Sequence, residues 1–208
     1  MRIVITPDNV DEALSRAAEV LHHGGLVAFP TDTVYGLAAM VFVEEAVERL
    51  FVAKIRDRSK AIPVLLAQMR DMSRVAQRVP AAAWQLAGSF WPGALTMVLP
   101  KSPFMPDIVT AGGPTVAVRV PDHRLAIRLI ERAKSPLATT SANLSGQPDP
   151  ITADDVEASL GDSVDLLLDG GPCPGRFAST VIDLTVSPPR ILRPGPIRWE
   201  DMESLLMS

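Results

Sequence analysis

The sequence predicts an α/β fold, with a twisted, mixed sheet of parallel and antiparallel strands flanked by helices. Segments whose apolar residues recur at helical spacing alternate with short runs of consecutive apolar residues, as they do where helices cover a buried sheet. Toward the C-terminal end, three apolar runs follow one another without an intervening helical segment. The strand–helix–strand rhythm of a wholly parallel sheet is lost there, which favours a mixed sheet.

The helices follow from apolar spacing and from the residues that begin and end them. The first is predicted from an N-cap at Asn9 to about His23, where two glycines stop it. Thr152 and Asp155 begin another, because their side-chain oxygens can hold the free amides of a first turn. Further helices are expected over 44–54, 80–90, 122–134 and 197–207. Strands are expected over 26–29, 63–67, 95–99, 116–120, 137–140, 164–168, 180–184 and 190–192.

The composition indicates one cytoplasmic domain over residues 1–208. Of its 208 residues 47% are apolar, and no long linker interrupts them, which suits a single hydrophobic core. The net charge of −4 disfavours an extended duplex-binding face, although it allows a local basic cleft. The N-terminus lacks a signal-peptide core, and no apolar run approaches ~20 residues. We therefore expect no membrane span.

Cysteine and histidine do not form a reactive or metal-binding set. Cys173 is the only cysteine and lies between two prolines, so it forms no internal disulfide and is interpreted as inert. The histidines, His22, His23 and His123, are scattered rather than clustered. No metal ligand from a protein side chain is therefore predicted.

The first apolar strand ends in an unusual polar run. Two hydroxyls and a carboxylate, Thr31, Asp32 and Thr33, follow the strand over 26–29, and Tyr35 is the only tyrosine of the chain. The apolar residues can stay in the core while the polar end lines a ligand cleft.

A row of cations offers one way to hold phosphates, since the chain has neither a G-x-x-x-x-G-K-[ST] nor a G-x-G-x-x-G motif. Lys54, Arg56, Arg58 and Lys60 fall at every second position. If the segment is extended, all four side chains project to one side and could meet a polyphosphate. The alternative is a solvated helix end, where cations are favourable.

A second polar group follows the strand over 137–140. Ser141 and Asn143 stand where ligands bind in α/β sheets, and their side chains can both donate and accept hydrogen bonds to a phosphate or a base edge. The alternative is a turn or helix cap, since S-A-N-L-S-G is rich in turn formers.

Three arginines are a third signal. Arg119 interrupts an apolar strand, so it needs a partner, which could equally be a ligand carboxylate or an internal acid. Arg193, before a Pro-Gly turn, has the same character, whereas Arg176 is interpreted as a solvated loop residue. F-W-P-G-A-L-T, residues 90–96, is interpreted as a corner of the core.

The ordered set of motifs PTDTVYGL, KIR, FWPGALT, VAVRVP, TTSANLSG, STVIDL and ILRPG resembles the YrdC-like family over residues 24–195. The best-defined activity of that family is threonylcarbamoyl-AMP synthesis. The resemblance implies a large cleft over the sheet. It also implies conversion of L-threonine, bicarbonate and ATP, with Mg²⁺, into threonylcarbamoyl-adenylate and pyrophosphate.

The resemblance also implies site residues. The catalytic positions of the family fall on Lys54, Arg56, Ser141 and Asn143. Its L-threonine positions fall on Thr33, Arg119, Thr139 and Ser179. Its ATP contacts include the catalytic positions and add Lys60, Thr115 and Arg193. The chain departs from the commoner pattern at Asp57 and Ala61, where prolines are frequent, and at Leu65.

The implied partners are proteins that transfer the threonylcarbamoyl group to tRNA, with weak binding of tRNA itself. Longer members carry a second C-terminal domain, so the resemblance implies a short form that relies on separate transfer proteins. Two other functions stay open: a diverged relative with another substrate, and an RNA-binding module that uses the basic cleft.

Overall fold

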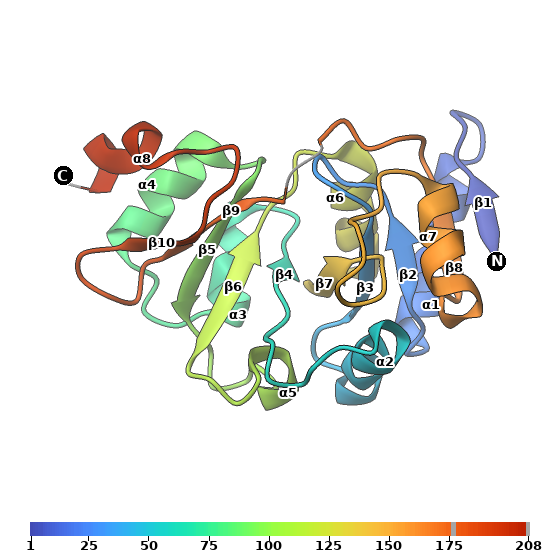
Figure 1. The fold of residues 1–208 in the computed structure, drawn as a ribbon, viewed down its shortest axis with the longest axis horizontal. Helices are drawn as coiled ribbons and strands as arrows, with labels where there is room; N and C mark the ends of the chain where they lie inside the picture. Colours follow the sequence, from blue (N-terminus) through green and yellow to red (C-terminus); the bar gives the residue numbers. More distant parts are fainter. Residues whose placement is uncertain (176–177, 207–208) are drawn as a thin grey trace.

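The computed structural model, which describes residues 1–175 and 178–206, is built on a ten-stranded sheet. Its spatial order is β1-β8-β2-β3-β7-β4-β6-β5-β9-β10 (Figure 1). The strands are β1 (Arg2–Val4), β2 (Val27–Phe29), β3 (Gly36–Met40), β4 (Val64–Leu65), β5 (Leu95–Pro100), β6 (Thr115–Arg119), β7 (Leu137–Ser141), β8 (Leu166–Asp169), β9 (Thr180–Asp183) and β10 (Arg190–Arg193). Parallel pairs such as β5–β9 stand beside antiparallel pairs such as β5–β6, so the predicted mixed sheet is confirmed.

The described residues form eight α-helices. They are α1 (Val10–His22), α2 (Glu44–Lys54), α3 (Met72–Val75), α4 (Ala81–Phe90), α5 (Asp107–Thr110), α6 (Arg124–Ala133), α7 (Ala153–Leu160) and α8 (Trp199–Leu206). The six expected helices are all present; position 207, predicted to end the last one, lies outside the described residues. The very short α3 and α5 were not predicted, because four residues are too few to show a period. No helix among the described residues is both long and apolar enough to cross a bilayer.

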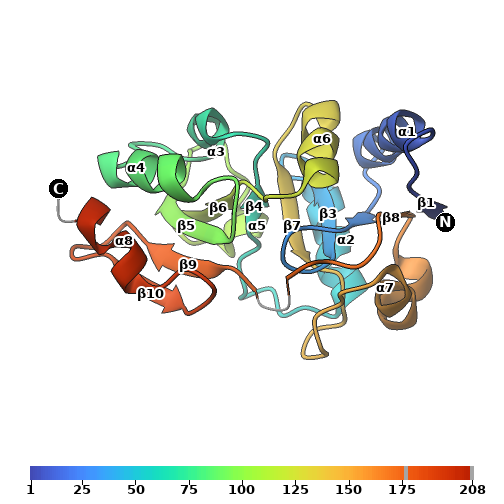
Figure 2. The ribbon, with the colours of Figure 1, turned by 90° about the horizontal axis from the view of Figure 1, so that it is seen from above.

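Helices cover both faces of the β2–β3–β7–β8 half of the sheet. Helices α1 and α6 pack side by side on one face, and α2 and α7 lie on the other (Figure 2). The strand period of two divides the side chains between these layers. In β2, for example, Val27 and Phe29 join the α1–α6 cluster, whereas Ala28 joins the cluster of α2 and α7.

Two strands, β1 and β3, were missed by sequence analysis. β3 is a Gly-Leu-Ala-Ala-Met segment, and Gly and Ala are poor strand formers. It is a strand because β2 and β7 hydrogen-bond to it on both sides, and Leu37, Ala38 and Ala39 are fully buried. A Cβ at Gly36 would lie 2.9 Å from the Thr139 methyl group, so the close approach of β3 to β7 requires glycine there.

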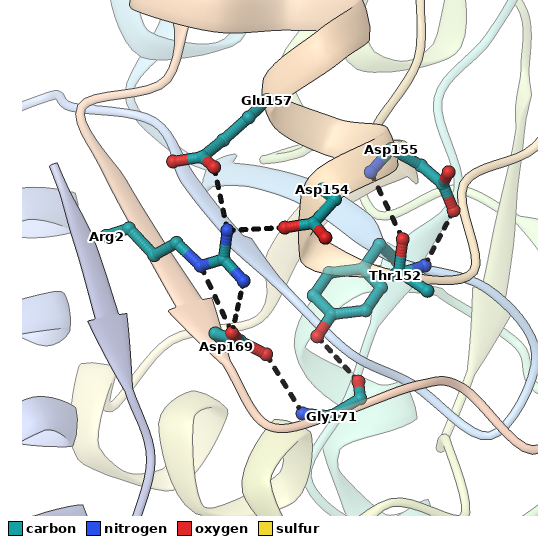
Figure 3. A network of polar contacts seen from close by, with 8 residues as sticks. Arg2, Thr152, Asp154, Asp155, Glu157, Asp169 and Gly171 are labelled. Carbon is teal, nitrogen blue, oxygen red and sulfur yellow. Dashed lines mark hydrogen bonds and ion pairs between the residues drawn. The ribbon is translucent and has the colours of Figure 1, made fainter.

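An ion cluster attaches the short edge strand β1 to the rest of the fold. The Arg2 guanidinium binds Asp154 and Glu157 of α7 and Asp169 at the end of β8, at 2.6–2.8 Å (Figure 3). Asp169 also accepts from the Gly171 amide, and the Gly171 carbonyl accepts from the Tyr35 hydroxyl at 2.7 Å. The polar run after β2 is thereby linked to the loop that follows β8.

The two predicted helix caps have different outcomes. At α7 the predicted capping box is present: Thr152 accepts from the Asp155 amide, and the Asp155 carboxylate accepts from the Thr152 amide (Figure 3). Asn9 does stand at the N-cap of α1, but its side chain makes no cap hydrogen bond there. It binds Val4 and Thr6 instead, and so closes the turn between β1 and α1.

The capping box predicts a measurable loss of stability. Thr152→Ala removes one acceptor from the first turn of α7 and is expected to lower the free energy of unfolding by about 1 kcal/mol. Urea unfolding of the variant and the parent protein measures the difference. Thr6→Ala is the matched control, since Thr6 is exposed and its hydroxyl makes no hydrogen bond within the described residues. Equal losses in both variants would contradict the capping role.

Candidate active site

Polar ends of several strands meet around one cleft of about 310 Å³. The loop after β2, the end of β7, the start of β9 and the ends of β6 and β10 all contribute side chains. Seven of the residues predicted for the site line this cleft: Thr33, Arg56, Arg119, Thr139, Ser141, Ser179 and Arg193. Lys54, Asn143, Lys60 and Thr115 are not among the lining residues.

Lys54 lies beneath the cleft rather than in it. The residue is 1% exposed, and its ammonium donates to the carbonyls of Ser141 and Asn143 and to the Asn143 side-chain oxygen. In return, the Lys54 carbonyl accepts from the Ser145 amide at 3.0 Å. All three ammonium donors are therefore occupied within the protein. The expectation that Lys54 faces phosphates differs from this placement, in which it holds the loop after β7.

The loop after β7 is further fixed by Asn143. Its side-chain oxygen accepts from the Ser141 hydroxyl at 2.6 Å, and its amide nitrogen donates to the Gln147 carbonyl at 2.6 Å. The Ser141 hydroxyl donates its proton to the Asn143 side chain, so only its lone pairs can bind a ligand in the cleft. The hydrogen bonds show the turn that was one interpretation of this segment, and Ser141 lines the cleft; a ligand site here stays a prediction.

The predicted row of four cations does not form. Helix α2 ends at Lys54, and Ile55 takes the left-handed conformation (φ 50°), so the chain turns instead of continuing as a strand. Arg56 enters the cleft, with its guanidinium donating to the Lys60 and Ala61 carbonyls. Arg58 turns back to the Glu48 carboxylate on α2. One cation of the four therefore lines the cleft.

Arg119 has the internal acidic partner that was one of its two predicted alternatives. Its guanidinium donates to the Asp32 carboxylate, to the Gly93 carbonyl at 2.8 Å and to the Thr33 hydroxyl at 3.2 Å. Burial lowers the pKa of Arg119 and the charge of Asp32 opposes that shift, so the guanidinium stays charged. Arg119 also lines the cleft, so a ligand carboxylate can still reach it.

Arg193 is bound to Ser179, another residue that lines the cleft. Its guanidinium donates to the Ser179 carbonyl through Nε at 3.1 Å and Nη2 at 2.9 Å, and to the Ser179 hydroxyl at 3.2 Å. Burial lowers the pKa of Arg193, as it does that of Arg56. The cleft thus contains three partly desolvated guanidiniums, which attract anions more strongly than solvated cations do.

Thr115 and Lys60 lie away from these contacts. Thr115 begins β6 and Arg119 ends it, so the two are about 13 Å apart along the strand. Lys60 contributes a backbone carbonyl to Arg56, while its side chain does not line the cleft. The ATP contacts implied for both residues remain predictions.

Sequence analysis missed three polar residues around the cleft. Asp32 was recognised as polar but not as the partner of Arg119. Thr96 lines the cleft although F-W-P-G-A-L-T was interpreted as core; Trp91 and Leu95 of that motif are buried as expected. Asp149 is the only carboxylate among the described lining residues. The hydroxyl in an apolar strand was the available signal for Thr96, whereas nothing in a Pro-Asp-Pro turn pointed to Asp149.

Cys173 and His123 are not among the residues that line the cleft. Burial raises the pKa of Cys173 to about 11, which keeps the thiol protonated, in line with an inert residue. His123 precedes α6, where its side chain makes no cap hydrogen bond, and burial lowers its pKa. Arg176 lies outside the described residues. Within them, no three acidic, histidine or cysteine side chains gather into a metal site.

A family model matches most of the chain. The family model named Sua5/YciO/YrdC, described as telomere recombination, matches residues 19–195. The chain belongs to the Sua5/YciO/YrdC family. The resemblance inferred from the motifs over residues 24–195 is thereby confirmed.

Individual relatives extend the family comparison. A Pyrococcus abyssi member named threonylcarbamoyl-AMP synthase is 44% identical over 190 residues, which are 91% of this chain and 56% of that protein. A Mycobacterium tuberculosis member with a provisional name of the same kind is 39% identical over 201 residues, or 96% of this chain and 92% of that protein. The chain thus spans just over half the length of the first relative and nearly all of the second.

A solved structure of a Sua5/YciO/YrdC member has the same fold. P. abyssi Sua5 complexed with L-threonine matches with a TM-score of 0.93 and 40% sequence identity. The match covers 99% of this chain and 60% of that one. The architecture that surrounds the cleft is therefore shared with a protein that binds L-threonine.

The buried ammonium predicts a pH dependence of stability. Burial and the nearby charge of Arg56 lower the pKa of Lys54 to about 8. Between pH 8 and its ordinary pKa of 10.5, the unfolded chain holds the proton that the folded protein releases. The contribution of Lys54 to the free energy of unfolding therefore rises with pH in that window. Relative to Lys54→Met, the free energy of unfolding of the parent protein should gain about 2 kcal/mol between pH 7.5 and 9.5.

Urea unfolding at several pH values measures this gain, because the titration of other groups cancels between the two proteins. A difference that stays constant with pH would mean that Lys54 keeps its proton and that the carbonyl cage outweighs burial.

Proposed function

We propose that this protein is a threonylcarbamoyl-AMP synthase, an adenylyl-transferring enzyme that acts on L-threonine, bicarbonate and ATP. The observation that carries the proposal is the composition of this cleft. The guanidiniums in the cleft suit the phosphates and the carboxylate of the substrates. Beside them stand threonine and serine hydroxyls that suit a small polar amino acid. The names of the relatives and the L-threonine complex of the P. abyssi protein support the same assignment.

The reaction needs no side-chain nucleophile. The amine of threonine forms a C–N bond with carbon dioxide derived from bicarbonate, releasing water overall, and gives a carbamate. A carbamate oxygen then attacks the α-phosphorus of ATP, the bond to the β-phosphate oxygen breaks, and pyrophosphate leaves. Catalysis of this kind rests on positioning and charge stabilisation, and orientation alone can account for roughly 7–11 kcal/mol of barrier.

The cleft residues divide between the two substrates in this proposal. Arg119 and Thr33 bind the amino acid. Arg56 and Ser141 approach the phosphates from the other side, with Arg193 stabilising negative charge. Lys54 and Asn143 act from below by holding the loop that carries Ser141. They are positioning residues in this arrangement.

Mg²⁺ would accompany ATP rather than sit in a protein cage. Magnesium is usually held by one or two carboxylates together with substrate phosphates and water. Asp149 supplies one carboxylate on the cleft wall, near the charges of Arg193 and Lys54, so the donor set suits a metal carried by the nucleotide. The metal would neutralise phosphate charge and favour departure of pyrophosphate.

The adenylate would serve threonylcarbamoylation of adenosine in tRNA, in the cytoplasm. Because an acyl-adenylate is an activated donor, a transfer protein must consume it, and contact with that protein or with tRNA would be transient. No observation in the cleft favours RNA binding as the primary function, or a substrate other than threonine.

Substrate dependence tests the assignment. Purified protein with ATP and Mg²⁺ should release pyrophosphate only when both L-threonine and bicarbonate are present, with L-serine much poorer. Mass spectrometry should detect the threonylcarbamoyl-adenylate. ATP binding without threonine-dependent release of pyrophosphate would reject the synthase.

Arg56 offers a sharper test with a control two residues away. Arg56→Ala removes a charged contact to phosphate and should lower the turnover number about 100-fold. Arg58→Ala should leave turnover within twofold, because Arg58 pairs with Glu48 on α2 and does not line the cleft. Turnover retained in Arg56→Ala would show that this residue does not stabilise the transferring phosphate.

A further inference from the structure

Thr96 of β5 and Ser179, just before β9, form a buried pair of hydroxyls. Their oxygens are 2.7 Å apart, and the residues are only 3% and 4% exposed. The pair is fixed by the sheet, because β5 and β9 run side by side and Leu95 is in register with Thr180 (Figure 1). Both residues line the cleft.

One of the two O–H groups in this hydroxyl pair has no acceptor within the described residues. Two hydroxyls carry two protons, and their mutual hydrogen bond uses one, whichever residue donates it. Arg193 donates to the Ser179 hydroxyl and so occupies one of its lone pairs. Within the described residues, neither hydroxyl donates to any other acceptor. One O–H therefore remains for a ligand in the cleft, and that ligand must present an acceptor.

Arg119 adds further hydrogen-bond donors beside this hydroxyl pair. One step beyond the Met97–Val118 pair in the β5–β6 register, Thr96 stands opposite Arg119, so their side chains share a face. Three of the five N–H groups of Arg119 are used by Gly93, Thr33 and Asp32. The two that remain and the free O–H of the hydroxyl pair favour an anionic oxygen.

The wall formed by Thr33 and Thr139 has the opposite polarity. The Thr31 hydroxyl donates to the Val34 carbonyl at 2.7 Å, so in its 3.0 Å contact with Thr33 the proton comes from Thr33. The Thr139 hydroxyl donates to the Leu137 carbonyl at 3.1 Å. Both protons are donated within the protein, and Arg119 already donates to one lone pair of Thr33, so Thr33 and Thr139 have only lone pairs left to offer a ligand. This wall suits the N–H groups of an amine.

We propose that Thr96 is a positioning residue for the amino-acid substrate and that it acts through Ser179. Ser179, held in place by Thr96, and Arg119 bind the substrate carboxylate, while Thr33 and Thr139 accept from its amine. This inference rests on the proposed function and adds an orientation to it.

Ligand binding tests the role of Thr96 without requiring turnover. Calorimetry measures the dissociation constants of L-threonine and of L-threoninol, in which a hydroxymethyl group replaces the carboxylate. Thr96→Val keeps the side-chain shape but frees the Ser179 hydroxyl to rotate. It should weaken L-threonine about fivefold to tenfold and L-threoninol less than twofold, whereas Thr96→Ser should retain parent affinity.

Thr110→Val is the matched control for loss of a buried threonine hydroxyl. Thr110 is 5% exposed, and its hydroxyl bonds Lys101 and the Asp107 carbonyl outside the cleft, so both ligands should bind this variant as they bind the parent. Urea unfolding of each variant verifies that it is folded.

The outcomes separate the inference from the proposed function. Equal weakening of both ligands in Thr96→Val, or no weakening, would overturn the carboxylate role. If the parent protein binds L-threonine but releases no pyrophosphate, the synthase assignment fails, and the ratio of the two affinities still decides the role of Thr96. A parent protein that binds no L-threonine would overturn both.

Discussion

The buried ammonium of Lys54 is the contact on which the floor of the cleft depends. Moving an ammonium out of water costs several kcal/mol, and the cost is offset here because the carbonyls of Ser141 and Asn143 and the Asn143 side chain take up all three protons. The same contact joins the end of α2 to the loop after β7. Removing it would leave buried acceptors unpaired and free the segment that carries Ser141.

The end of α2 also decides which cations reach the cleft. Because Lys54 is held beneath the loop and Ile55 turns the chain, Arg56 is the next side chain to point inward. Arg119 and Arg193 then complete a positive lining whose charge is moderated by Asp32 on one side and Asp149 on the other. A lining of this kind attracts anions, because the two carboxylates do not neutralise all three guanidiniums.

Hydroxyl polarity adds direction to the charge of the cleft. The hydroxyls of Thr33, Thr139 and Ser141 donate to acceptors within the protein, whereas the Thr96–Ser179 pair has one O–H left for a ligand. Small hydroxyl side chains would look interchangeable by composition. The internal partners of each one determine whether it donates or accepts, and thereby how a zwitterionic ligand would lie.

Local patterns determined much of this protein from sequence alone. The bounds of α2, the capping box at Thr152 and the mixed sheet follow from spacing and side-chain chemistry that act within a few residues. Seven of the expected site residues do line one cleft, because the ordered motifs of the family carry them.

Tertiary structure alone decided the rest. Gly-Leu-Ala-Ala-Met becomes β3 only between β2 and β7, Arg119 finds Asp32 across 87 residues, and Thr96 meets Ser179 across 83. Such pairings depend on where the sheet places distant segments, which no local pattern encodes.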